Sequence, residues 1–200
     1  MPLRQRITLL FISIMVILCF TSAYSLLSSS GTLRKEIFIH KISQYLKTEN
    51  MKLDRGQLRT IASIVYEQSI LHEVDYRLIL AMMKVESNFR HDAVSSMGAR
   101  GLLQIKPSLA KHIAHQAGIQ WSGYKTLDEP RNNIKIGVYF FAQLMDDFEN
   151  TNSALHAYNV GPTRAKRNGA GKDKPAKTYR GFPRVVMAEY EKNMAMLPDP

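Results

Sequence analysis

The sequence is poor in cysteine and in acidic residues. Cys19 is the only cysteine among 200 residues, so the chain can form neither an intrachain disulfide nor a metal site built on several cysteines. Asp and Glu number 17 against 27 Lys and Arg, which gives a formal net charge of +10. This balance favours polyanionic partners, namely nucleic acid, an acidic membrane surface or an anionic wall polymer. Charge alone does not choose among them.

Internal repeats and convincing β-type alternation are also lacking. Hydrophobic residues make up 45% of the chain and charged residues 22%, a composition typical of a globular protein and not of a disordered one. Two hundred residues suffice for one core of ordinary size and are too few for two comfortable domains. We therefore predict a single all-α domain of short helices.

The first 27 residues hold the longest uncharged stretch. Arg4 and Arg6 precede a run without charges from Ile7 to Leu27, a pattern typical of an export signal. Cleavage after Ala23 would suit a signal peptide, but about twenty uncharged residues can also span a bilayer and remain as an inner-membrane anchor. Either outcome places the rest of the chain in the periplasm or cell envelope and excludes nucleic acid as a partner.

Helical spacing of apolar residues predicts the folded domain from residue 55 to residue 194, after a linker and short helix over residues 28–54. In residues 55–71 the apolar stripe runs from Leu58 to Ile70 or Leu71. Asp75 stands where an N-cap is expected for the next helix. Residues 128–133 have the composition of a turn. Further helices are predicted over residues 102–119, 132–148, 153–160 and 183–194.

Glu86 lies on the apolar face of the helix that follows Asp75. It is seven residues from Ile79 and four from Met82, so it shares their face. Apolar neighbours raise the pKa of a carboxylic acid because they disfavour its charged form, and a raised pKa suits a general acid. The alternative is a glutamate at the helix boundary that pairs with a nearby cation.

The segment ESNFRHDAVSSMGARGLLQI, residues 86–105, resembles the signature of the lytic transglycosylase family, which is related in fold to goose-type lysozyme. One motif position differs, since Leu103 stands where Met is usual. Two more blocks, NNIKIGVY and ALHAYNVGP, resemble the family in the expected order. The matching positions are Glu86, Ser87, Ser95, Gly98, Ala99, Gly101, Leu102, Gln104, Asn133, Ile134, Gly137, Tyr139, Ala157, Tyr158, Asn159 and Gly161.

The resemblance implies cleavage of peptidoglycan glycan strands with Glu86 as the one catalytic residue. Glu86 would protonate the oxygen between N-acetylmuramic acid and N-acetylglucosamine. It would then accept the proton of the muramic C6 hydroxyl, which closes a 1,6-anhydro ring. An internal nucleophile removes the need for a second carboxylate. The resemblance implies no cofactor and no metal, and it leaves open whether cuts fall within strands or at their ends.

Substrate-binding roles are implied for Ser95, Gln104, Tyr158 and Asn159, whose hydroxyl and amide groups suit sugar hydroxyls and N-acetyl groups. Without the resemblance, Gln104 and Asn159 would be read as hydrogen-bonding residues at helix ends and Tyr158 as core. The family's late Glu-Thr-x-x-Tyr-Val segment is only partly matched, and Tyr179 is the expected substitute for its Tyr.

Three other functions compete with this prediction. A lysozyme-like hydrolase would need a second carboxylate, for which Asp92 is the nearest candidate. A non-catalytic wall-binding or secretion-scaffold protein is disfavoured by the intact Glu86 motif, and nucleic-acid binding is excluded if the chain is exported. His112 and His115 have the spacing of a metal pair but lack further ligands. The sequence identifies no protein partner.

Overall fold

The computed structural model describes residues 15, 31–49, 51, 53–148, 150–167 and 180–200. The chain divides into two compact units, Met1–Phe38 and Ile39–Pro200. Residues 31–38 of the first unit are helical, and so are residues 39–48 of the second. The predicted signal or anchor segment, residues 1–27, lies outside the described residues apart from Met15. Within the described part, no helix is both long and apolar enough to cross a membrane.

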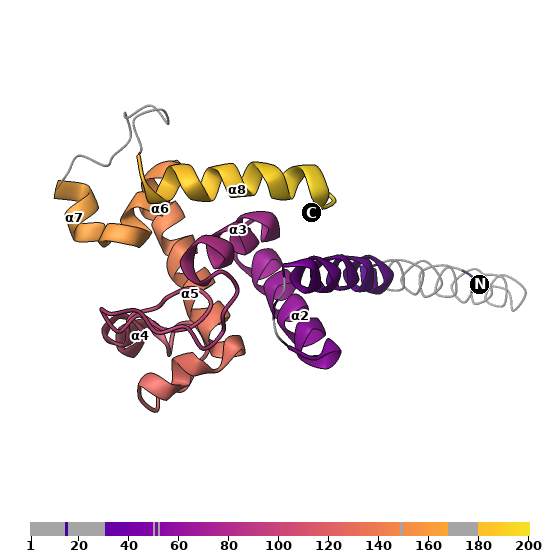
Figure 1. Ribbon diagram of the computed structural model, residues 1–200, viewed down its shortest axis with the longest axis horizontal. Coiled ribbons are helices and arrows are strands. Elements are labelled where there is room, and N and C mark those ends of the chain that lie inside the picture. The colour runs from indigo at the N-terminus through magenta and orange to yellow at the C-terminus, as the bar shows by residue number, and fades with distance from the viewer. Residues whose placement is uncertain (1–14, 16–30, 50, 52, 149, 168–179) are drawn as a thin grey trace, which may run out of the picture. The chain divides into compact units, whose positions relative to one another are not determined.

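The second unit is helical, which confirms the predicted all-α class (Figure 1). In its described residues, β-structure is limited to isolated antiparallel bridges of Arg100 with Val94 and with Ile105. After the helical residues 39–48 the elements are α2 (Arg55–Leu71), α3 (Tyr76–Ser87), α4 (Pro107–Ile113), the 3-10 helix η1 (Tyr124–Asp128), α5 (Pro130–Asp147), α6 (Thr151–Val160), α7 (Pro162–Arg167) and α8 (Phe182–Met196).

Helix α2 has the predicted bounds, and a capping box begins it. The Asp54 carboxylate accepts the Gln57 backbone N–H at 2.9 Å, and the Gln57 side chain accepts the Asp54 N–H at 3.0 Å, which satisfies two otherwise free donors. The predicted apolar stripe is wrong at its C-terminal end. Ile70 and Leu71 are 59% and 68% exposed, whereas the polar Gln68 and Ser69 directly before them are buried.

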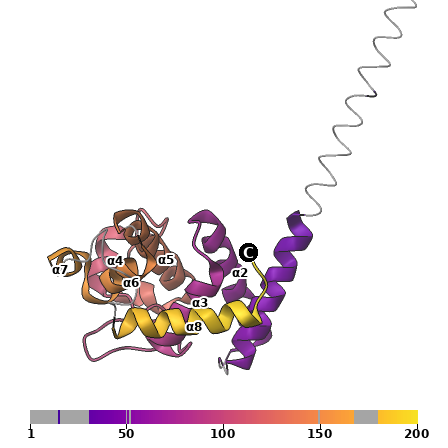
Figure 2. The same cartoon turned by 90° about the horizontal axis from the view of Figure 1, so that it is seen from above.

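Helix α3 is the centre of the domain and packs against α2 and α8 (Figures 1 and 2). Asp75 caps it as predicted and accepts the backbone N–H of Arg77 at 2.8 Å. Asn193 of α8 donates to the Arg77 carbonyl at 2.9 Å and accepts the Tyr45 hydroxyl at 2.8 Å. This buried amide ties three helical segments together, so α3 is held firmly on both sides.

The helix predictions need correction in three places. Residues 102–106 are not helical, because Gly101 and Gln104 adopt positive φ angles of 75° and 47° that no α-helix accommodates. The predicted turn over residues 128–133 ends early, since Pro130 is the first residue of α5, where a missing N–H costs nothing. Helix α7 lies in a stretch for which no helix was predicted.

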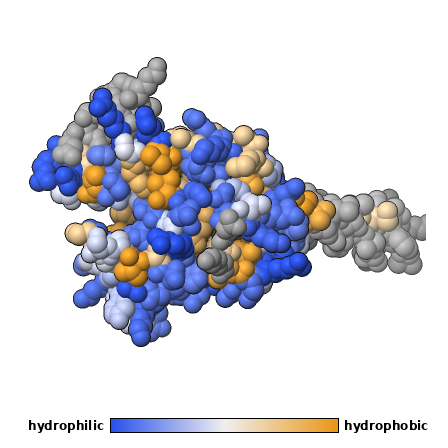
Figure 3. All heavy atoms as spheres, in the orientation of Figure 1, coloured by the Kyte–Doolittle hydropathy of each residue, from blue (hydrophilic) through white to orange (hydrophobic). Residues whose placement is uncertain are grey.

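The surface seen in Figure 3 is largely hydrophilic, with apolar side chains in separate small patches. The core instead gathers beneath α3 and α5, where Tyr76, Met82, Phe141 and Leu102 are almost fully buried. Because the core surrounds α3, a polar residue on its inner face is shielded from water.

Candidate active site

Glu86 lies in the last turn of α3, where the chain changes direction sharply. Asn88 and Phe89 both adopt left-handed backbone conformations, with φ angles of 50° and 58°, which cost about 1–2 kcal/mol for residues other than glycine. The Ser87 hydroxyl, which is buried, donates to the Leu102 carbonyl at 3.0 Å. The end of α3 is thereby joined to the loop that follows it in the motif.

Asn133 of α5 sets the shape of this motif loop, residues 93–105. Its buried side-chain amide donates to the carbonyls of Arg100 at 2.8 Å and Leu127 at 3.1 Å. Its oxygen accepts the backbone N–H of Leu103 at 2.8 Å. A Cβ at Gly101 would overlap the Asn133 amide and lie 2.9 Å from the Leu127 carbonyl. Position 101 therefore requires glycine both for its positive φ and for the close approach of Asn133 and Leu127 to its Cα.

Leu103 is held between α5 and α6. A Cβ at Gly137 would lie 2.9 Å from the Leu103 Cβ, so this glycine lets the loop lie directly against α5. The Tyr158 hydroxyl donates to the Leu103 carbonyl at 2.8 Å. The Tyr158 ring packs 5.5 Å from that of Phe140 and stacks on Phe182 of α8 at 6.4 Å, 8° from parallel. The motif loop, α5 and α8 thus each contact this one tyrosine of α6.

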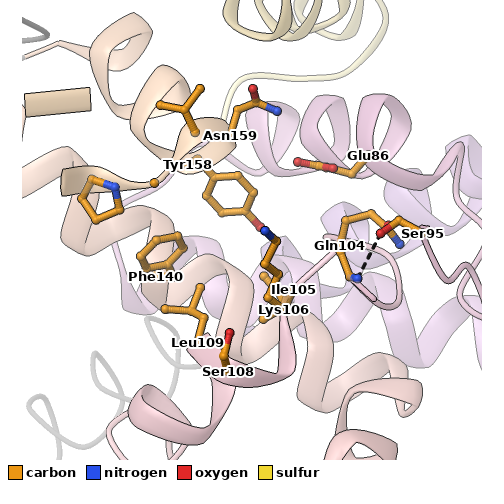
Figure 4. Close-up of a pocket in the computed structure, with 14 residues that line it drawn as sticks. Glu86, Ser95, Gln104, Ile105, Lys106, Ser108, Leu109, Phe140, Tyr158 and Asn159 are labelled. Atoms are coloured by element: carbon orange, nitrogen blue, oxygen red, sulfur yellow. Dashed lines mark hydrogen bonds between the residues drawn. The ribbon is translucent and has the colours of Figure 1, made fainter. Parts of the chain in front are cut away.

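The end of α3, the motif loop, α4, α5 and α6 line a pocket of about 400 Å³, within the range of ligand-binding cavities. Figure 4 shows the Glu86 carboxyl group pointing into it, toward Tyr158. Among the residues that line the pocket in the described part of the chain, Glu86 is the only acid. The lining consists of Glu86, Ser95, Ala99, Gln104, Ile105, Lys106, Ser108, Leu109, Phe140, Tyr158, Asn159, Val160, Gly161 and Pro162.

Burial raises the pKa of Glu86 from 4.5 to about 7. The carboxyl group forms no hydrogen bond or ion pair with a residue that the structure describes, so nothing there offsets the loss of hydration. The pKa of the Tyr158 hydroxyl is also raised, first by burial and then by the charge of Glu86. The pocket therefore favours a protonated Glu86 near neutral pH, as a general acid requires.

The structure brings four of the five predicted substrate-binding residues to this pocket. The Ser95 hydroxyl accepts the Ala99 N–H at 3.0 Å, drawn dashed in Figure 4. Gln104 donates its amide to the Ala93 and Gly101 carbonyls at 3.2 and 2.9 Å, and its side-chain oxygen accepts no hydrogen bond from a described residue. Tyr158 lies deeper, and Asn159 is exposed at the rim.

Tyr179, the fifth predicted residue, lies outside the described residues. Asp92, the candidate second carboxylate of a hydrolase, does not line the Glu86 pocket. It is exposed and borders a different cavity with Glu49 and Lys84. In the described part of the chain no cluster of three or more His, Cys, Asp or Glu side chains could hold a metal ion.

Sequence reasoning missed several side chains that line the pocket, among them Lys106, Ser108, Leu109 and Phe140. Lys106 directly follows the motif and could have been noticed for that reason. Phe140 lies three residues after Gly137, on the face of α5 that meets the motif loop. No sequence signal distinguishes it from an ordinary core phenylalanine.

A half-buried carboxylic acid in a pocket of a helical domain has the surroundings that a single-carboxyl general acid requires. The sequence profile of the Transglycosylase SLT domain matches residues 64–180, more than half of the chain. The chain belongs to this family, and the resemblance read from the motifs is confirmed.

Curated relatives match part of the chain. The soluble lytic murein transglycosylase of Salmonella typhimurium is 30% identical over 127 residues, which cover 61% of this chain and 20% of that protein. A transglycosylase of Enterobacteria phage PRD1 is 28% identical over 114 residues, 57% of this chain and 40% of that protein. The chain thus spans less than half the length of these relatives.

A solved structure shares the fold. The 70-kDa soluble lytic transglycosylase of Escherichia coli superimposes with a TM-score of 0.61 at 23% identity, over 79% of this chain and 30% of that one. The likeness identifies the fold of the helical domain as that of a region of the larger enzyme.

Proposed function

We propose that this protein is a peptidoglycan lytic transglycosylase. It cleaves the β-1,4 bond between N-acetylmuramic acid and N-acetylglucosamine and forms a 1,6-anhydro-muramic end. The observation that carries the proposal is Glu86, a pocket-lining acid whose pKa burial raises to about 7. Membership of the family and the relatives' names support the same reaction.

In the first step the Glu86 carboxyl proton passes to the glycosidic oxygen, and the bond from that oxygen to muramic C1 breaks. In the second step the Glu86 carboxylate accepts the proton of the muramic C6 hydroxyl as its oxygen bonds to C1. The proton is returned to Glu86, so one residue serves as acid and then as base. The energetic cost of a buried carboxylate between the steps favours its reprotonation.

The other pocket residues position the sugar. The free side-chain oxygen of Gln104 and the hydroxyl of Ser95 suit N-acetyl and hydroxyl groups of the substrate. Tyr158, fixed by its hydrogen bond to Leu103, forms one wall opposite Glu86. Tyr179 is proposed to contribute from the segment before α8.

The cell envelope is the proposed site of action, because peptidoglycan lies there and the first 27 residues have the pattern of an export signal or anchor. The only partner proposed is the glycan strand. A hydrolase on the same fold is less well supported, because Asp92 lies at another cavity and no second acid lines the Glu86 pocket among the described residues.

The mass of the products tests the proposal. Purified wall sacculi are digested with the wild type and with Glu86→Gln, and the fragments are analysed by mass spectrometry. The wild type is expected to release fragments that lack one water and have no reducing end, and Glu86→Gln is expected to release almost none. Reducing fragments of full mass would show a hydrolase, and equal release by Glu86→Gln would remove Glu86 from the mechanism.

A further inference from the structure

Lys106 lies at the entrance to α4, directly after the motif loop. Its backbone is fixed, because its carbonyl accepts the Ala110 N–H at 3.0 Å as the helix begins. Its side chain is exposed and lines the same pocket as Glu86 and Tyr158. In Figure 4 this side chain rises from its backbone toward the region between those two residues.

The Lys106 ammonium group is available to a ligand. It forms no hydrogen bond or ion pair with any residue that the structure describes. Among the described lining residues it is the only Lys or Arg, as Glu86 is the only acid. When Glu86 holds its proton, the pocket therefore carries one net positive charge. A cavity that is walled by protein and carries an unpaired cation favours an anionic ligand.

The proposed substrate has one carboxyl group close to the reacting atoms. N-acetylmuramic acid bears a lactyl ether on C3 of the ring whose C1 reacts. In strands that carry peptides this carboxyl is tied up in an amide, whereas in peptide-free strands it is a free carboxylate. The lactyl group is attached to the same ring as the bond that Glu86 protonates, so it enters the same pocket. Lys106 lines that pocket and therefore lies near the lactyl carboxylate.

We propose that Lys106 is a specificity-determining residue that binds the free lactyl carboxylate and so favours glycan strands stripped of peptides. The proposal rests on the proposed function. A hydrogen bond from an ammonium group to a carboxylate joins two opposite charges and is therefore stronger than one to a neutral amide oxygen. The ammonium charge also offsets the repulsion between the lactyl carboxylate and Glu86 once Glu86 has given up its proton.

A binding experiment separates this proposal from the reaction itself. The Glu86→Gln protein, which leaves the sugar chain uncut, is titrated at neutral pH with two tetrasaccharides of alternating N-acetylglucosamine and N-acetylmuramic acid. One carries free lactyl acids, and the other carries lactyl methylamides. We expect the acid to bind about tenfold more tightly, equivalent to about 1.4 kcal/mol. The preference should shrink as salt is added.

Three further variants in the Glu86→Gln background identify the residue responsible. Lys106→Met is expected to bind acid and amide equally, and Lys106→Arg to restore the preference. Lys111→Met is the matched control, because Lys111 is exposed on α4, five residues after Lys106, but does not line the pocket. The proposal would be overturned if the Glu86→Gln protein with Lys106 intact bound the two ligands equally. It would also be overturned if Lys106→Met kept the preference for the acid.

The same ligands keep the two proposals distinguishable. If wild-type protein binds the acid preferentially but yields no anhydro product from wall sacculi, the proposed reaction fails and the carboxylate site stands. If anhydro product forms and the preference is absent, the reaction stands and the role of Lys106 fails. Failure to bind either tetrasaccharide would overturn the Lys106 proposal.

Discussion

Replacing Glu86 with Gln should stabilise the fold above neutral pH and leave it almost unchanged in acid. Burial raises the pKa of Glu86 to about 7 in the folded chain, against 4.5 as the ordinary value. Between these two values the folded chain holds a proton that the unfolded chain has lost. The free energy of unfolding of the wild type therefore falls as pH rises through this window.

The size of the effect follows from the separation of the two pKa values, which corresponds to about 3 kcal/mol. Above pH 7 the wild type bears this whole cost, because its carboxylate is charged and poorly hydrated. Glutamine has nearly the same shape and no charge, so the variant avoids the cost. Below pH 4.5 both side chains are neutral, and the two proteins should differ little.

Urea denaturation from pH 4 to pH 8.5 measures the difference between wild type and Glu86→Gln at each pH. Other titrating groups affect both proteins alike and cancel in this difference. Glu191→Gln, the same exchange at an exposed position of α8, is the matched control. A difference that stays constant between pH 4.5 and 7, or that favours the wild type at high pH, would refute the reasoning.

Three more predictions follow from packing and hydrogen bonds. Gly101→Ala should cost at least about 2 kcal/mol in urea denaturation, because its Cβ would overlap the Asn133 amide. Gly98→Ala is the control, because Gly98 has the same φ of 75° but no atom within 4 Å of its Cβ position. An equal loss of stability in the two variants would show that overlap with Asn133 is not the cause. Tyr158→Phe should lose about 1–2 kcal/mol of stability and turn over more slowly, and unchanged product release would contradict its role. Asp75 is partly buried, which opposes its charged form, but its hydrogen bonds lower its pKa below the ordinary 3.8. Asp75→Asn should therefore lower the free energy of unfolding by about 2 kcal/mol at pH 7 and by less at pH 3, where Asp75 begins to be protonated. Equal shifts in melting temperature at the two pH values would show that the charge of Asp75 does not contribute.

The sequence predicted those elements whose cause is local. Helix α2 has the predicted bounds because its apolar spacing and its Asp54 cap lie within the same short stretch. Asp75 was identified as a cap for the same reason. The motif residues also predicted which side chains would meet Glu86, since Ser95, Gln104, Tyr158 and Asn159 all line its pocket.

What the sequence could not predict depends on residues distant along the chain. The helix predicted over residues 102–119 begins only at Pro107, because Asn133 holds the motif loop in another shape. The pocket around Glu86 likewise needs Phe140 of α5 and Tyr158 of α6, which lie far from Glu86 along the chain. Lys106 received no prediction, since only the folded loop places it beside Glu86 and Tyr158.

A titration of the Glu86 side chain itself tests the central claim most directly. Carbon NMR of the side-chain carboxyl groups, with the Glu86 signal assigned by its loss in Glu86→Gln, gives the pKa in the folded protein. The burial of this carboxyl predicts a midpoint near pH 7. A midpoint at or below 4.5, the value of an exposed glutamate, would mean that Glu86 holds no proton to donate at neutral pH.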